Sequence, residues 1–337
     1  MTRKLAILAA AVAATTSALA IPTMAEAKTG AASAANAQIR YVWVKSCGEK
    51  DYTVPCGSWN FVTRDGKTRT LGDARVYAVN ARGKVDKESL AALAISDDGE
   101  KVAYFRKSDN KLVIRDLATN RVRALPGTAS RLPKGLGMSD LVTTLSPDGS
   151  SLLIDYQDEN DKLPSLLVNM ATGKIAKLRT DLYLQGFSPD SRHVLASRYT
   201  RENTTELRVL DENGATTGRK VVPQVIANNT PQALANDGNT VAVMINMTGG
   251  KQRLRVYDLE SDSVGDAVNV NVPKNETPQQ LRWDDSGNLT VWEMRSDKDG
   301  NTNGLVRRTL DPTSGGTTKT DSFPLTAKVY MWWVPGE

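Results

Sequence analysis

The sequence predicts an all-β fold, and three observations support this prediction. A turn tetrapeptide of the type Ser-Pro-Asp-Gly stands between apolar runs, as in "TTLSPDGSSLLIDY" from Thr143 to Tyr156. Similar turns recur along most of the chain at nearly even intervals. The composition, 40% hydrophobic and 6% aromatic over 337 residues, allows a core and is rich in the small polar residues that favour turns.

The turn aspartates set the spacing of the repeat. The turns align on Asp98, Asp148, Asp190, Asp237 and Asp285, at steps of 50, 42, 47 and 48 residues. An aspartate at this position accepts a hydrogen bond from the backbone two residues on, and the following glycine tolerates a positive φ. We therefore interpret these aspartates as turn-formers and not as catalytic carboxylates. A period of about 40–50 residues filled with short strands is typical of the blades of a β-propeller.

Each repeat has the same internal order. In the first, "LAIS", "KVAYF", "KLVIRDL" and "RVRAL" are four short strand-like segments joined by three turns. Four such segments form one antiparallel sheet. The second and fourth repeats show the same arrangement, so we expect one four-stranded blade per repeat.

The two ends of the chain supply the remaining strand-like segments. These include "IRYVWVKS", "SWNFVTRDG", "ARVYAVNARGKV" and "AKVYMWWVPGE", which hold four of the six tryptophans: Trp43, Trp59, Trp332 and Trp333. We predict that the C-terminal strand joins the N-terminal strands in a composite blade, giving six blades within one domain, residues 39–337. Seven blades are the alternative if residues 39–90 hold more than one sheet. In the composite blade, the aromatic residues would pack across the strands and close the ring. A second interpretation is that they form an exposed partner-binding patch.

The turn motif, with its "VYDL"-type third strand, resembles the WD-like repeats of the TolB family and of prolyl-oligopeptidase-type propeller domains, over about residues 85–310. Ser146-Pro147-Asp148-Gly149 matches the family turn fully, whereas the turn at Asp190 lacks the glycine and the turn at Asp237 lacks Ser-Pro. The N-terminal domain of TolB and the hydrolase domain of the peptidases have no counterpart here. The resemblance therefore implies the propeller fold and neither the Tol role nor peptidase activity.

The N-terminus has the pattern of a secretory signal. Arg3 and Lys4 precede an apolar run, and small-residue cleavage sites follow at Ala20 and Ala27. We prefer cleavage after Ala27, which makes residues 1–27 a signal peptide and residues 28–38 a flexible mature N-terminus. An uncleaved anchor is the alternative, but the run is short for a bilayer span, and no later segment is apolar enough to cross a membrane. The sequence thus predicts a secreted or extracytoplasmic protein.

Charge and cysteines agree with this location. The net charge is +5, or +4 without residues 1–27, and the chain has no dense basic block, so we expect no nucleic-acid partner. Cys47 and Cys56 are the only cysteines, and a close pair in an exported protein predicts a disulfide.

The sequence holds no motif for an enzyme or a cofactor. It lacks a G-x-S-x-G elbow, a P-loop and a dinucleotide fingerprint, and we expect the single histidine, His193, to be exposed or packed between blades. Asp299, Asn301 and Asn303 match the first half of a calcium loop, but Leu310 replaces the bidentate glutamate. A polar hairpin turn is the favoured interpretation, and we predict no cofactor.

The blade-to-blade loops are the expected place for function, because they share one face with the loops between second and third strands. We predict a non-enzymatic scaffold that binds a protein, a peptide or a cell-envelope polymer through this face. The alternatives are a lactonase- or lyase-type enzyme with a cation bound in the channel, and a purely structural envelope protein. The candidate binding residues in these loops are Arg131, Lys134, Tyr183, Asn228, Asn229 and Lys274.

Overall fold

The structure of the protein, a computed structural model, describes residues 38–48, 52–284, 286–326 and 328–337. The predicted signal peptide, residues 1–27, and most of the predicted mature N-terminus, 28–38, lie outside these ranges, as does Asp285.

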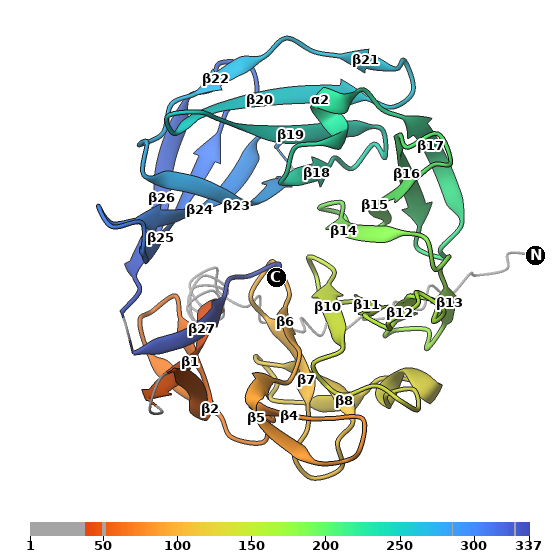
Figure 1. Cartoon of the computed structure of the whole chain (residues 1–337), viewed down its shortest axis with the longest axis vertical. Helices are drawn as coiled ribbons and strands as arrows, with labels where there is room; N and C mark the ends of the chain where they lie inside the picture. The colour runs from red at the N-terminus through yellow and green to blue at the C-terminus, as the bar shows by residue number, and fades with distance from the viewer. Residues whose placement is uncertain (1–37, 49–51, 285, 327) are drawn as a thin grey trace, which may run out of the picture.

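Six sheets are arranged in a ring, each with its first strand towards the centre (Figure 1). Helical structure within the described ranges is limited to the short elements η1 (Gly127–Ser130) and α2 (Gln224–Ala227). The predicted all-β propeller of six blades is confirmed. We number the blades from the first complete repeat.

Blades 1 to 3 each have four strands in consecutive order. Blade 1 consists of β6 (Leu93–Ile95), β7 (Lys101–Phe105), β8 (Leu112–Asp116) and β9 (Val122–Ala124). Blade 2 consists of β10 (Leu141–Leu145), β11 (Ser151–Tyr156), β12 (Leu166–Asn169) and β13 (Ile175–Lys177). Blade 3 consists of β14 (Tyr183–Phe187), β15 (His193–Tyr199), β16 (Thr205–Asp211) and β17 (Thr216–Val221).

Blades 4 to 6 vary this plan. Blade 4 has its outer strand in two pieces: β18 (Gln232–Leu234), β19 (Thr240–Met247), β20 (Lys251–Asp258), β21 (Ser263–Val264) and β22 (Val268–Val270). Blade 5 consists of β23 (Glu276–Trp283), β24 (Leu289–Ser296), β25 (Thr302–Leu310) and β26 (Thr317–Pro324). Blade 6 joins the two ends of the chain: β27 (Val329–Trp333), β1 (Ile39–Gly48), β2 (Thr53–Thr63) and β3 (Thr68–Leu71).

Blade 6 closes the ring as predicted. β27 pairs with β1 in antiparallel register, with Trp332 opposite Trp43. The buried Trp59 meets Trp333 edge to face, with ring centroids 5.1 Å apart, and its Nε1 donates a hydrogen bond of 2.7 Å to the Arg75 carbonyl. Aromatic packing inside the composite blade thus holds the two ends together.

Residues 77–90 do not form a seventh blade. They fold into a separate two-stranded hairpin, β4 (Tyr77–Val79) and β5 (Val85–Leu90), between blades 6 and 1. This hairpin packs on the long loop before blade 2, where the Met138 amide donates a hydrogen bond of 2.9 Å to the Val79 carbonyl. The alternative of seven blades is therefore wrong, because a lone hairpin has no third and fourth strands to pair with.

The core lies between neighbouring blades. The second strands are buried on both faces, and in β7 four consecutive residues, Val102–Phe105, are buried. Stacked sheets cover both sides of such strands, which explains why apolar runs replace simple alternation there. Phe105 and Leu112 of blade 1, for example, share one cluster with Leu152 and Ile154 of blade 2.

The repeated turns link first to second strands and fasten one blade to the next. Asp148 Oδ1 accepts hydrogen bonds from Ser146 Oγ at 2.8 Å, from the Ser150 amide at 2.9 Å and from Ser191 Oγ of the next blade at 2.9 Å. Gly149 has φ +62°, as the turn requires. The predicted structural role is confirmed for Asp98, Asp148, Asp190 and Asp237. In the last repeat Asp284, at the position of Ser146, accepts hydrogen bonds from the amides of Ser286 and Asn288.

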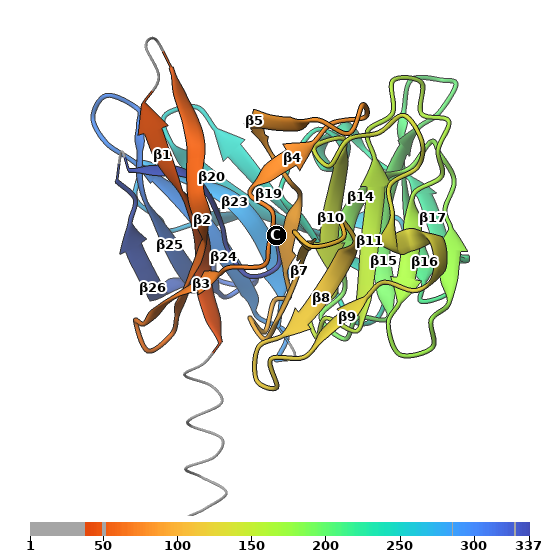
Figure 2. The ribbon, with the colours of Figure 1, turned by 90° about the horizontal axis from the view of Figure 1, so that it is seen from below.

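The ring has two distinct faces. The turn face carries the connections between first and second and between third and fourth strands. The long-loop face carries the blade-to-blade connections and those between second and third strands. The β1–β2 and β4–β5 hairpins project on the long-loop face, at the top of Figure 2.

Candidate functional site

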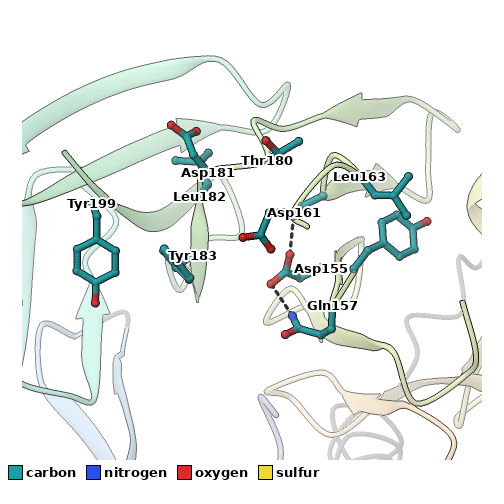
Figure 3. Close-up of a pocket in the computed structure, with 11 residues that line it drawn as sticks. Asp155, Gln157, Asp161, Leu163, Thr180, Asp181, Leu182, Tyr183 and Tyr199 are labelled. Carbon is teal, nitrogen blue, oxygen red and sulfur yellow. Dashed lines mark hydrogen bonds between the residues drawn. The ribbon is translucent and has the colours of Figure 1, made fainter. Parts of the chain in front are cut away.

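A cavity of about 230 Å³ opens on the long-loop face between blades 2 and 3. Its lining comes from the β11–β12 connection, the β13–β14 connection and Tyr199 at the end of β15. Figure 3 shows Tyr183 and Tyr199 on one side and Asp155, Gln157 and Asp161 on the other. Three separate segments of the chain therefore supply one site, which we call the interblade cavity.

Asp155 is the half-buried carboxylate of this cavity. It accepts hydrogen bonds from Ser165 Oγ at 2.6 Å and from Gln157 Nε2 at 3.1 Å. Burial raises the pKa of the Asp155 carboxyl and outweighs these hydrogen bonds, while the charges of Asp161 and Asp158 act in the same direction as burial. Within the described ranges, neither Asp155 nor Asp161 lies within ion-pair distance of a lysine or arginine.

Asp181 differs from these two carboxylates because arginines neutralise it. Its Oδ2 lies 2.7 Å from Arg179 Nη2 and 3.4 Å from Arg198 Nη1. The hydrogen bond from Arg179 lowers the pKa of Asp181 to about 2. Arg198 also binds Glu206 on β16, so Asp181 belongs to the ion-pair network of blade 3.

Two tyrosines form the other wall of the cavity. The rings of Tyr183 and Tyr199 meet edge to face, with centroids 5.6 Å apart, although the residues are 54% and 69% exposed. Exposed tyrosines next to a cavity offer apolar area and a hydrogen-bonding hydroxyl to a ligand at little entropic cost.

The structure disperses the other predicted site residues around the same face. Arg131 and Lys134 are exposed in the loop before blade 2, and Lys274 is exposed before blade 5. Asn228 is the exposed C-cap of α2, whereas the Asn229 side chain donates to the Val225 carbonyl at 2.9 Å. Of the six predicted residues, Tyr183 lies in the interblade cavity.

Residues 297–303 form a hairpin turn, as the favoured interpretation expects. The Asp297 carboxylate accepts hydrogen bonds from the amides of Asp299 and Asn301, both at 2.9 Å. Asn303 Oδ1 accepts a bond from Arg295 Nε at 3.0 Å, which occupies the oxygen that a cation would need. In the part of the chain that the structure describes, no group of three or more His, Cys, Asp or Glu side chains is placed to hold a metal ion.

Two further predictions are confirmed. Cys47 and Cys56 form a disulfide near the tip of the β1–β2 hairpin. His193 is half-buried and packs towards the next blade, where a Cβ added to Gly238 would lie 3.2 Å from its ring.

The part of the ring centre that borders blades 1, 2 and 6 has a mainly apolar lining. A cavity of about 450 Å³ runs along β6, β10 and β27, with Leu93, Val142, Met331 and Trp332 among its residues. Its carboxylate, Glu337, accepts hydrogen bonds from the Val334 amide at 3.0 Å and from Gln279 Nε2 at 3.4 Å. In this cavity, the carboxylate that a cation could contact is that of Glu337.

A buried charge cluster joins three strands of blade 5. Arg308 lies 2.8 Å from Glu276 Oε2 and 3.0 Å from Glu293 Oε2, and Glu293 is fully buried. Gln252 of blade 4 donates to the Glu276 carbonyl at 2.8 Å. Burial and the neighbouring Glu276 raise the pKa of the Glu293 carboxyl above its usual range, against the opposing effect of Arg308.

Sequence reasoning missed the partners of Tyr183. Tyr199 ends the second strand of its repeat, and Asp155 and Asp161 flank the same position one repeat earlier. The strand order already places the ends of the second strands on the long-loop face. An aromatic residue at such an end, like Tyr199, could therefore have indicated a binding site.

The ring of six four-stranded sheets defines the protein as a six-bladed β-propeller, and its fold is similar to that of solved propellers. TolB from Acinetobacter baumannii aligns with a TM-score of 0.50 and 15% identity, over 89% of this chain and 67% of that one. A protein of unknown function from Bacteroides caccae aligns with a TM-score of 0.44 and 14% identity, over 88% of this chain and 98% of that one. A puromycin-hydrolyzing peptidase from Mycobacterium tuberculosis aligns with a TM-score of 0.42 and 19% identity, over 86% of this chain and 54% of that one.

The likeness to TolB from Acinetobacter baumannii confirms the TolB-type propeller fold that the turn motif implied, at the level of the fold alone. No protein-family description and no curated protein matches the chain. Among the residues that the structure describes, no helix is long and apolar enough to span a bilayer.

Proposed function

We propose that the protein is an extracytoplasmic, non-enzymatic scaffold that binds a protein, a peptide or a cell-envelope polymer on its long-loop face. The observation that carries this proposal is the interblade cavity, where two exposed tyrosines stand opposite two carboxylates that form no ion pair with any described residue. The Cys47–Cys56 disulfide supports the compartment, because disulfides persist in oxidising environments.

The two faces differ in the polar groups that they leave for a partner. On the turn face, the repeated aspartates accept bonds from their own turns and from neighbouring blades. On the long-loop face, tyrosines of the kind that dominate binding interfaces remain exposed. Arg131, Lys134, Asn228 and Lys274 are exposed on that face, and we include them as peripheral contacts.

The test is capture from the envelope fraction and culture medium of the producing organism, with the chain from Lys28 as bait. Three variants are compared with it: Tyr183→Ser/Tyr199→Ser in the cavity, Arg131→Ala/Lys134→Ala on the loop, and Arg121→Ala/Arg192→Ala on the turn face. The last variant removes the same number of positive charges as the loop variant and serves as its matched control.

We expect a captured partner to be lost with the tyrosine variant, weakened with the loop variant and retained with the control. The partner is then identified, and its affinity for the four proteins is measured directly. A partner retained equally by all four proteins, or no partner at all, would contradict the proposal.

A further inference from the structure

We propose that the interblade cavity receives one basic side chain, the guanidinium or ammonium group of an arginine or lysine in a partner peptide. This inference rests on the proposed function and names the chemistry of its ligand. The argument uses the size, the charge and the aromatic wall of the cavity.

The size of the cavity suits a single side chain. Its volume of about 230 Å³ is below the range of roughly 300–1,000 Å³ that is usual for pockets holding whole drug-sized ligands. The cavity is open on the surface of the long-loop face, so a side chain can enter while its backbone stays outside.

The charge of the cavity favours a cationic ligand. Asp155 and Asp161 both face the cavity and have no ion pair with any described residue, although the chain as a whole carries an excess of positive charge. The hydrogen bonds to Asp155 come from Ser165 and Gln157, which are neutral. A cation between the two carboxylates would offset their mutual repulsion, which a neutral ligand would leave unchanged.

The aromatic wall fits the same ligand. Tyr183 and Tyr199 lie across the cavity from the carboxylates, and their rings can attract a cation placed over their faces. Leu163 and Leu182 add apolar lining that can contact the methylene stem of a long basic side chain. A carboxylate pair, an aromatic pair and an apolar wall together match an amphipathic cation.

The test uses two short peptides of equal shape and different charge. Acetyl-Gly-Arg-Gly-amide and the same peptide with citrulline in place of arginine are titrated into the chain from Lys28, and binding is followed by NMR. Citrulline keeps the size and most donors of arginine but has no charge. We expect the arginine peptide to bind at least about tenfold more tightly, which corresponds to about 1.4 kcal/mol.

Two variants with equal loss of charge assign the effect to the cavity. Asp155→Asn/Asp161→Asn should lower the affinity for the arginine peptide to that for the citrulline peptide. The amide that replaces the Asp155 carboxylate keeps an acceptor for Ser165. Asp266→Asn/Asp299→Asn removes two exposed carboxylates outside the cavity and should leave the preference for arginine intact. Tyr199→Ala should weaken binding of the arginine peptide by about two- to fivefold.

Equal binding of the two peptides by the native chain would overturn the inference, and so would equal effects of the two double variants. If the native chain captures a macromolecule that the tyrosine variant loses but does not prefer arginine to citrulline, the proposed function stands and this inference falls. If the preference for arginine is absent and no macromolecule is captured, both fall.

Discussion

Asp148 on the turn face and the Asp155–Asp161 pair on the long-loop face differ in what their carboxylates contact. On the turn face, Asp148 accepts bonds from serine hydroxyls and a backbone amide of two blades, so its carboxylate holds the structure together. On the long-loop face, Asp155 and Asp161 lie beside a cavity with no ion pair to any described residue. Asp148 therefore serves stability, whereas Asp155 and Asp161 leave charge beside the cavity for a partner.

Among the changes that compare the two faces, the largest expected effect is on the turn face. Asp148→Ala removes the acceptor for Ser146, Ser150 and Ser191, and we expect the free energy of unfolding to fall by about 2–3 kcal/mol. Urea denaturation measures this loss. Asp161→Asn on the long-loop face is the control, because asparagine tolerates the φ of +48° that Asp161 adopts, and it should change the value by less than about 0.5 kcal/mol. Equal losses would remove the contrast between the faces.

The Cys47–Cys56 disulfide stabilises the β1–β2 hairpin on the long-loop face. Its loss should have the next largest effect on the free energy of unfolding. Cys47→Ser/Cys56→Ser opens a link between residues nine apart in sequence, and we expect a loss of about 2 kcal/mol through the greater entropy of the unfolded chain. Reduction of the native chain should give the same loss in thermal unfolding. If neither treatment changes the melting temperature, the hairpin does not depend on the disulfide.

The buried Glu293 carboxyl lies within blade 5, and its raised pKa adds a pH dependence to the stability of the fold. Because the pKa of Glu293 is raised from 4.5, the folded state keeps a proton that the unfolded state has already released. Its stabilising contribution is complete below about pH 4.5 and is lost as the pH rises through the folded pKa, so the free energy of unfolding should decline with pH over that interval.

Glu293→Gln should remove this decline, whose slope is at most about 1.4 kcal/mol per pH unit. Denaturant unfolding from about pH 4 to about pH 9 compares the two proteins across the interval in which the proton is lost. Parallel curves would show that Glu293 does not cause the pH dependence.

The smallest expected effect on stability is in the cavity. Tyr199 is 69% exposed, so Tyr199→Ala should change the free energy of unfolding by less than about 0.5 kcal/mol while it weakens binding. Thermal unfolding checks this separation, with the buried Trp59→Ala as a contrast that should cost about 3–5 kcal/mol. A large loss for Tyr199→Ala would assign the tyrosine pair to the fold.

The fold could be predicted further than the site, for a physical reason. The turn at Asp148 and the tryptophans at Trp59 and Trp333 act through local geometry and strand order, which the sequence pattern contains. The β4–β5 hairpin could not be distinguished from part of a blade, because its partners are set by packing against the loop at Met138. The contact of Tyr183 with Tyr199 depends on how the β13–β14 loop lies against the end of β15, and no local pattern encodes that distance.

The antiparallel pairing of β1 with β27 also has a mechanical consequence. Val42 pairs with Trp333, and successive pairs lead towards Lys45 and Val329, away from the segment before β1 and the segment after β27. A pull on those two segments would load one residue pair at a time, as in opening a zipper, whereas a shearing pull would load all of them together. Tension along the chain would therefore peel blade 6 apart at low force, and the five blades made from continuous chain would yield later.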